Sequence, residues 1–559
     1  MIYLLTALGC IGGLLFGYDT GIISGALVLI DSEFALTQVE ESLVVSLCVA
    51  GALISSIFAG SMADYFGRKS VVIASSLAFI IGAVLMALSR DFRLLLVGRF
   101  IVGLGVGSAS LIVPIYLAEC APTEHRGSIV ACVNMSVTFG QLLACIVAGL
   151  FSGIKDGWRW MLGLAGMPAL LQLVGFWLWV PESPRFLIQK GYTDLGSLAL
   201  RKLRNTIDVR QELHDILISV RKEEDALARE AVSFNILDRS ASGLTVAETA
   251  RNPLSDFKTG YIVGSVDRSP TKAGNDYGAE DISEYEGASR KELKQPSVWK
   301  LLQKITTARA LLVGSMLQSG QQIGGINTVM YFGATIFTLG GSSHITAIWL
   351  TVGLSFCNFI GSCISFYLQD RVGRRLLTLL SMSGVSLSLL IIAAAFFFTV
   401  EARSEAGQSG DGCISSSVWL IFFSICVYLV CFASGMGSTP WTVCAEIYPT
   451  SVRGVATSIT TSVNWTSNFI MSMSFLSIVS VFSEEGAFLL YSLLSLCFVA
   501  FFYKYLPETR GVPLENIPRL FYDAKWGKEK NCYTSVPTSE AAESLNAKHD
   551  SDYGITINT

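Results

Sequence analysis

Side-chain amides stand in a segment that is otherwise apolar enough to cross a membrane. Gln321, Gln322 and Asn327 lie within this long apolar run, and Gly324 and Gly325 stand between them. A carboxamide offers two N–H donors and a carbonyl acceptor without carrying a charge. Such groups match the hydroxyls of a polyhydroxylated solute, so we expect these three amides to bind one. The two glycines should let a helix break and pivot between the amides.

Two features of this segment admit a second interpretation. The amides could instead bridge neighbouring helices by hydrogen bonds, as polar side chains do in membrane proteins. Tyr331 and Phe332 follow the amides, and we predict that they close over the solute from the outside as an external gate. Ordinary packing of the two aromatic rings against lipid or another helix is the alternative.

An acidic residue lies inside the first apolar segment. Asp19 is flanked by Gly17 and Gly21, and an acidic side chain at this depth costs roughly 2.5–3.5 kcal/mol on insertion scales. Arg99, inside another apolar segment, is the expected partner. Because burial favours the protonated carboxyl and a nearby arginine favours the carboxylate, separating the pair would change its proton affinity. We predict that the two residues couple proton binding to a conformational change; a static ion pair between two helices is the alternative.

The composition is that of a membrane protein. Of 559 residues, 51% are apolar and only 15% are charged, whereas a soluble chain carries about a quarter of charged residues. The net charge of −4 gives no basis for nucleic-acid binding, and most of the 13 cysteines lie in apolar runs, so we expect no disulfide framework. The sequon at Asn464 also lies in an apolar segment, where no glycan is expected. Without a nucleophile–base pair, metal cluster or phosphate loop, the chain is not expected to be an enzyme or to hold a cofactor or metal.

Apolar segments long enough to span a bilayer recur along the chain. A spanning helix needs about 20 mostly apolar residues, and about twelve segments meet this criterion. We expect no cleaved signal peptide, because the first segment is too long and contains Asp19. Basic turns at 64–69 and 370–375 are assigned to the cytoplasm, which places both termini there, and the plasma membrane is the expected location. The segments are 2–28, 42–63, 71–89, 94–117, 127–151, 158–180, 308–338, 345–368, 376–400, 417–444, 454–481 and 486–506.

A charged central region and a polar tail interrupt this pattern. Residues 186–230 mix charges with apolar residues at helical spacing, which predicts short amphipathic cytoplasmic helices. Residues 232–295 and 531–559 are rich in polar residues and are predicted to be disordered. The expected domains are an N-terminal six-helix half (1–180), a cytoplasmic loop with a disordered insert (181–306), a C-terminal six-helix half (307–506) and a cytoplasmic tail (507–559).

Three motifs occur twice along the chain in the same order. Their repetition predicts two parallel six-helix halves related by an axis along the membrane normal, an architecture of transporters that bind solute near the midplane. The pairs are 64–69 with 370–375, 114–127 with 440–454, and 181–185 with 507–511; they are offset by 306, 327 and 326 residues, measured from Asp64, Glu119 and Pro181.

On these motifs the chain resembles the sugar porter family of the major facilitator superfamily. The pair Pro-Glu-Ser-Pro-Arg (181–185) and Pro-Glu-Thr-Arg-Gly (507–511) is highly specific for that family, and the resemblance covers nearly the whole chain apart from the insert and tail. Residues 17–21, 347–350 and 446–449 resemble animal proton/myo-inositol cotransporters in particular. The resemblance implies an all-α membrane protein with twelve transmembrane helices in two pseudo-symmetric halves, the major facilitator fold.

The resemblance also implies roles for residues in both halves. The spacing from Glu119 to Gln141 and from Glu446 to Asn468 is 22 residues in each case, so Gln141 and Asn468 occupy equivalent positions and could face one cavity. A cytoplasmic network of charges would join the halves when the carrier faces outward, although a solvated positive patch would explain its basic residues alone. The implied solute-binding residues are Gln141, Gln321, Gln322, Asn327, Asn358, Trp441 and Asn468; the implied gate residues are Asp64, Arg68, Glu119, Arg126, Glu182, Arg185, Asp370, Arg374, Glu446 and Arg453.

The function that the resemblance implies is secondary active transport. We expect proton-coupled uptake of myo-inositol or a related cyclitol by alternating access, within a lipid bilayer and with no oligomer required. A facilitative or proton-coupled hexose transporter is the nearest alternative. A non-transporting nutrient receptor that signals through its insert and tail is a third. A channel is not expected, because the amides suit a bound solute better than a conducting pore.

Overall fold

The computed structural model describes residues 1–122, 126–206, 208–221, 305–406, 416–449, 452–512 and 517–521. Within these ranges all regular secondary structure is helical, as predicted. The chain divides into one unit of Met1–Leu217 with Leu302–Thr559 and a second of Ile218–Leu301. The predicted disordered stretches 232–295 and 531–559 lie outside the described residues.

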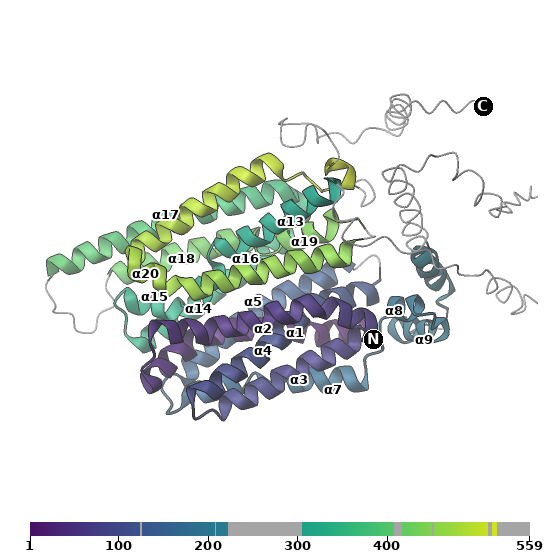
Figure 1. Cartoon of the computed structure of the whole chain (residues 1–559), viewed down its shortest axis with the longest axis horizontal. Helices are drawn as coiled ribbons and strands as arrows, with labels where there is room; N and C mark the ends of the chain where they lie inside the picture. Colours follow the sequence, from purple (N-terminus) through teal and green to yellow (C-terminus); the bar gives the residue numbers. More distant parts are fainter. Residues whose placement is uncertain are drawn as a thin grey trace, which may run out of the picture. The chain divides into compact units, whose positions relative to one another are not determined.

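Long apolar helices make up most of the first unit, and Figure 1 shows them side by side. Ten helical stretches of the described chain are long and apolar enough to cross a membrane. The helices that precede the central region are α1 (Ile2–Phe34), α2 (Gln38–Phe66), α3 (Arg68–Ala87), α4 (Phe92–Cys120), α5 (Arg126–Phe151), α6 (Gly157–Gly163) and α7 (Gly166–Leu178).

The second set of long helices departs from the predicted segments at three points. The 308–338 segment is divided into three short helices, 417–444 is divided into two, and 454–481 and 486–506 run on as one helix with a kink at Ser483, where φ is 64° and ψ 173°. The division of 308–338 and the merging of the last two segments account for a count of ten where about twelve were expected, since Val418–Ile447 still counts as one spanning stretch. The helices are α13 (Ile305–Ile323), α14 (Ile326–Tyr331), α15 (Gly333–Leu339), α16 (His344–Val372), α17 (Arg374–Ala406), α18 (Ser416–Ser434), α19 (Thr439–Ile447) and α20 (Arg453–Tyr505), followed by a 3-10 turn, η2 (Ile517–Phe521).

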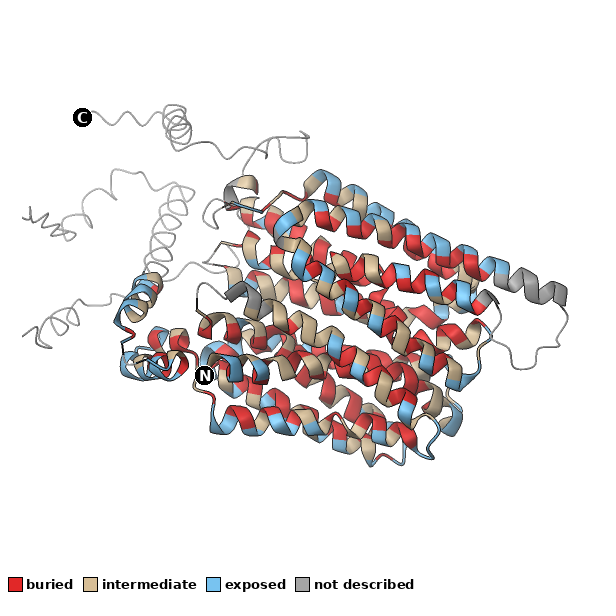
Figure 2. Ribbon diagram, turned by 180° about the vertical axis from the view of Figure 1, so that it is seen from behind, coloured by how far each residue is buried: buried red, intermediate tan, exposed pale blue. Residues whose placement is uncertain are grey.

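Large apolar side chains remain exposed on the outward faces of the bundle. Phe58, Leu77, Trp177 and Phe398 are among them, and Figure 2 shows exposed residues along the outer helices with buried residues between them. Monomeric soluble proteins rarely expose apolar surface on this scale. A surrounding bilayer explains it, because lipid tails bury these side chains instead of water.

The seventh predicted span, 308–338, is called helix seven below, and it breaks at its glycine pair, as the sequence predicted. Gly325 has a φ of +85°, in the left-handed region that favours glycine, and it separates α13 from α14. The hydroxyl of Tyr428 donates to the carbonyl of Gly324 at 2.6 Å, which satisfies a backbone acceptor that the broken helix leaves free. A second interruption at Phe332 separates α14 from α15.

A close helix contact adjoins the predicted proton site. A Cβ added to Gly17 of α1 would lie 1.8 Å from the carbonyl oxygen of Val137 on α5, so the two backbones meet at a distance that only glycine permits. We expect Gly17→Ala to destabilise the fold by about 3 kcal/mol, because tightly packed helices must separate. Thermal unfolding of the detergent-purified protein measures this. Gly153→Ala is the control, since nothing lies within 4 Å of an added Cβ there; equal melting temperatures for the two variants would contradict the expectation.

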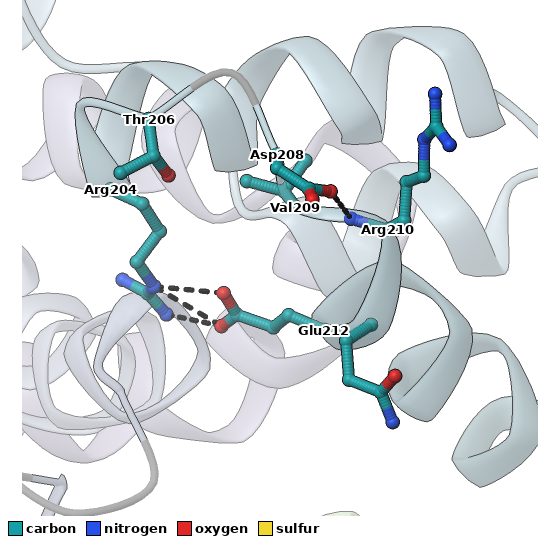
Figure 3. A pocket seen from close by; sticks show the side chains of 7 residues that line it. Arg204, Thr206, Asp208, Val209, Arg210 and Glu212 are labelled. Carbon is teal, nitrogen blue, oxygen red and sulfur yellow. Dashed lines mark hydrogen bonds and ion pairs between the residues drawn. The ribbon is translucent and has the colours of Figure 1, made fainter.

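Short helices follow α7, where amphipathic helices were predicted. They are α8 (Pro184–Gln189) and α9 (Thr193–Arg204), and Figure 1 shows them beyond the end of the bundle where the chain begins. Arg204 lies 2.5 Å from Glu212 and donates to the carbonyl of Cys120, the last residue of α4, at 2.9 Å. Figure 3 shows the Arg204–Glu212 pair at a pocket in this region. The pocket is lined by none of the predicted site residues. Arg204, through its hydrogen bond to Cys120, connects α9 to α4.

Candidate functional site

The amides of helix seven form a hydrogen-bonded group in which Gln321 and Gln322 are buried and Asn327 is half-buried. Gln322 donates to Asn464 of α20 at 3.1 Å, and Asn327 donates to Gln322 at 2.7 Å. Asn464 in turn donates to the side-chain carbonyls of Gln318 at 2.8 Å and Gln321 at 2.9 Å. Three predicted solute ligands therefore belong to one network, and two residues that the sequence analysis passed over, Gln318 and Asn464, complete it.

Gln318 and Asn464 share with the predicted solute ligands the feature that identified them, a side-chain amide in an apolar segment. Asn464 is an amide in an apolar segment and lies four residues before Asn468, so both face the same side of α20. The sequence analysis treated Asn464 only as part of a sequon. Applying the amide criterion to every apolar segment would have included it.

Two backbone carbonyls between α18 and α19 extend the hydrogen-bonded network of the helix-seven amides. Gln321 donates to the carbonyls of Met436 at 2.7 Å and Gly437 at 3.2 Å, in the turn between α18 and α19. Trp441 lies on α19 a few residues further on and is half-buried. Trp441 therefore follows closely in sequence the carbonyls to which Gln321 donates. A broad ring with one N–H donor suits the C–H face of a cyclic solute.

A second pair of amides joins the two predicted halves. Asn358 of α16 donates to the side-chain carbonyl of Gln141 on α5 at 2.7 Å, and both residues are buried. One turn away, the thiol of Cys145 lies 3.0 Å from the hydroxyl of Ser355 on the same two helices. The recorded hydrogen bonds place Gln141 and Asn358 in a group separate from the helix-seven network.

The aromatic pair after the helix-seven amides is buried. Tyr331 accepts a hydrogen bond from the amide of Asn468 at 3.3 Å, and Phe332 packs on Phe475 with ring centroids 5.2 Å apart. Just beyond, Ser24 of α1 accepts from the backbone N–H of Ala334 at 2.9 Å. Both rings therefore pack within the protein and not against lipid. This placement is compatible with a closed external gate.

The predicted proton pair is formed in the middle of the bundle. Arg99 Nη1 lies 2.5 Å from Asp19 Oδ1, and the two residues are 1% and 7% exposed. Arg99 Nε also donates to the backbone carbonyl of Val44 on α2 at 2.9 Å, and the thiol of Cys48 lies 3.1 Å from Asp19 Oδ2. The sequence predicted the ion pair but neither of its partners on α2.

The repeated charge motifs form two equivalent clusters. In the first, Arg68 lies 3.2 Å from both Glu119 and Asp64, and Glu182 accepts from the backbone N–H groups of Arg68 and Lys69 at 3.0 and 3.1 Å. Burial raises the pKa of the Glu182 carboxyl above its ordinary value, and these backbone hydrogen bonds oppose that rise. The carboxylate therefore works as a backbone anchor at the start of α3.

The second cluster repeats the first. Arg374 lies 3.2 Å from Glu446, Glu508 accepts from the backbone N–H groups of Arg374 and Arg375 at 2.9 and 3.0 Å, and Thr509 donates to Glu446 at 2.7 Å. The ion pairs of Arg68 with Glu119 and of Arg374 with Glu446 each lie within one predicted half, and Glu182 and Glu508 follow the last helix of the same half.

The remaining predicted gate residues are placed less fully. Arg453 donates to the carbonyl of Tyr448 at 3.4 Å and has a further interaction, and Arg185 also has a partner. The side chains of Arg126 and Asp370 lie outside the described residues, so the gate roles expected for these two residues stay predictions.

Solved structures share this arrangement of helices. The proton:xylose symporter XylE, described as a major facilitator superfamily protein, superimposes with a TM-score of 0.66 over 93% of this chain and 99% of that one, at 23% identity. A partially occluded inward-open conformation of XylE from E. coli gives the same TM-score at 22% identity. The protein is therefore a multi-pass membrane protein with the major facilitator fold, as predicted.

Sequence comparison defines the family more narrowly. The model of the family described as "Sugar (and other) transporter" matches residues 5–243 and 267–521. The chain belongs to this sugar transporter family, so it is a transporter and not an enzyme. It is 31% identical to the human "Proton myo-inositol cotransporter" over 93% of this chain and 82% of that protein. It is 31% identical to the "Probable inositol transporter 2" of Arabidopsis thaliana over 91% of this chain and 90% of that protein, and 30% identical to the "Glucose transporter GlcP" of Staphylococcus epidermidis over 92% and 96%.

Proposed function

We propose that the protein takes up myo-inositol or a related cyclitol together with protons, by alternating access across the plasma membrane, with both termini in the cytoplasm. The proposal rests on the buried Asp19–Arg99 ion pair, in a chain whose relatives include proteins named as proton myo-inositol cotransporters. A titratable acid with a fixed cation beside it can take up a proton when the two separate. That exchange supplies the drive that a facilitative carrier lacks.

The amide network supplies the proposed recognition of the solute. Gln321, Gln322, Asn327 and Asn464 satisfy one another in the absence of solute, and this prevents the penalty of unpaired polar groups in an apolar interior. A solute with several ring hydroxyls can replace these mutual hydrogen bonds one for one. An apolar molecule cannot, so the site would reject it.

The contacts between the predicted halves support alternating access. Gln141–Asn358 and Ser24–Ala334 join helices of different halves at or beyond the middle of the bundle, whereas the recorded ion pairs of Arg68 and Arg374 stay within one half. In the proposed topology the former lie towards the outside and the latter at the cytoplasmic ends. This distribution is expected of a state closed towards the outside.

A hexose is the second candidate solute. GlcP, a glucose transporter by name, is 30% identical, and pyranose hydroxyls offer the same hydrogen-bonding groups as cyclitol hydroxyls. Uptake of labelled myo-inositol and labelled glucose by cells expressing the protein, at acidic and mildly alkaline external pH, separates the candidates. We expect inositol uptake that rises as the pH falls.

Three outcomes of this uptake experiment would contradict the proposal. Glucose uptake without inositol uptake would exclude the cyclitol. Inositol uptake that is indifferent to pH would exclude the proton. No uptake of either solute, with the protein present at the cell surface, would favour a receptor.

A further inference from the structure

We propose that the thiol of Cys48 sets the proton affinity of Asp19 by donating a hydrogen bond to its carboxylate. The inference rests on the proposed proton-coupled function and adds a positioning residue to its proton site. Cys48 Sγ lies 3.1 Å from Asp19 Oδ2, while Arg99 Nη1 lies 2.5 Å from Oδ1. The two carboxylate oxygens are thus held by different donors, a permanent cation on one side and a neutral thiol on the other.

Helix α2 positions both groups that contact the Asp19 carboxylate, because it accepts a hydrogen bond from Arg99 and carries Cys48. The carbonyl of Val44 accepts from Arg99 Nε at 2.9 Å, and Cys48 follows one helical turn later on the same face. A Cβ added to Gly103 of α4 would lie 2.0 Å from the carbonyl oxygen of Cys48, so α2 and α4 meet backbone to backbone at this residue. This contact fixes the position of the thiol relative to the α4 helix that bears Arg99.

The groups around Asp19 differ in what they can contribute. Among the described titratable and charged side chains, Arg99 faces it from α4, Cys48 from α2 and Tyr331 from α14, and Tyr18 is its neighbour on α1. The hydroxyl of Tyr18 donates to the carbonyl of Met161, and that of Tyr331 accepts from Asn468. Cys48 is therefore the neutral donor that these contacts assign to the carboxylate.

The thiol suits a carboxyl group that must change its protonation state. A hydrogen bond donated to the charged form favours that form, so the thiol lowers the tendency of Asp19 to take up a proton. A thiol is also a weak acceptor, and it can accept from the carboxyl O–H once Asp19 is protonated. Cys48 can thus form a hydrogen bond with either state of the carboxyl group without moving.

The test is the pH dependence of myo-inositol uptake by the full-length protein in proteoliposomes. Removing the donor in Cys48→Ala should move the midpoint of uptake to more alkaline pH by about 0.5 to 1 unit, the size expected for one hydrogen bond from a weak, neutral donor. Cys48→Ser retains a donor and should lie closer to the unmodified protein. Cys120→Ala removes another buried thiol of the same half, at the opposite end of α4 from Arg99, and should leave the midpoint unchanged.

The outcomes separate this inference from the function on which it rests. An unshifted midpoint in Cys48→Ala, with pH dependence abolished in Asp19→Asn, would overturn the role of Cys48 and leave proton coupling through Asp19 intact. Persistent pH dependence in Asp19→Asn would instead contradict the proposed proton site. Where Cys48→Ala does not fold, infrared titration of the protonated carboxyl band that Asp19→Asn removes gives the same midpoint directly for Cys48→Ser. Equal midpoints for the unmodified protein, Cys48→Ser and Cys48→Val would also overturn the inference.

Discussion

Replacing Asp19 by Asn should abolish accumulation of solute against its gradient, while exchange of solute across the membrane continues. Asn keeps the size of the side chain and an acceptor for Arg99 but cannot take up a proton. One pH unit stores about 1.4 kcal/mol, which supports up to about tenfold accumulation for each proton carried. In proteoliposomes with an imposed gradient of one unit, the accumulation ratio should fall from several-fold to about one.

The surface residue Asp156 provides a matched control for that substitution. It also pairs with an arginine, with its Oδ1 2.6 Å from Arg159 Nη1, but its side chain is half exposed. Asp156→Asn should therefore leave accumulation unchanged, because a surface ion pair contributes little. Accumulation that survives in Asp19→Asn would mean that the buried pair is static, which is the alternative that the sequence left open.

Replacing Gln322 by Ala should raise the KM for solute by about 10- to 100-fold. Gln322 lies between Asn464 and Asn327. Its removal takes the donor from the side-chain carbonyl of Asn464 and the acceptor from the amide N–H of Asn327, and it takes one hydrogen-bonding group from the solute. Each such loss is worth roughly 1–3 kcal/mol, and 1.4 kcal/mol is a factor of ten. Initial rates of exchange at several solute concentrations give the KM.

Substitution of Gln172 is a control that distinguishes an effect on solute binding from an effect on stability. It is a fully buried amide of α7 that accepts from Ser76 at 3.0 Å and donates to the carbonyl of Leu8 at 3.2 Å, within one predicted half. Gln172→Ala should lower the melting temperature but leave the KM unchanged. Solute should raise the melting temperature of Gln172→Ala and not that of Gln322→Ala at the same concentration. The opposite pattern would make the helix-seven amides a structural bridge.

The sequence predicted the elements that depend on local pattern. Apolar length defined the spanning helices, and the Gly324–Gly325 pair identified the break that Gly325 makes at a φ of +85°. Asp19 and Arg99 were paired because two opposite charges in apolar segments need each other, and the structure brings them to 2.5 Å. Each of these inferences needs only the residue types within a single short segment, because a charge, an amide or a glycine pair in an apolar run is unfavourable unless it has a structural or functional role.

What the sequence did not show depends on three-dimensional neighbours. Cys48 looks like a small apolar residue until α2 is placed against α1, and Val44 contributes only a backbone carbonyl, which no side-chain pattern reveals. Likewise, only the packing of α3 against α4 brings Arg68 beside Glu119. The kink at Ser483 joins two predicted spans because the turn between them remains helical except at that residue.

The central claim is that movement of a cyclitol is coupled to movement of protons. Adding myo-inositol to proteoliposomes that contain the protein, with a pH electrode in a weakly buffered external medium, measures this coupling without a label. The account predicts alkalinisation of the medium on addition of myo-inositol, and none in liposomes that contain Asp19→Asn. Entry of myo-inositol with no change in external pH would contradict it.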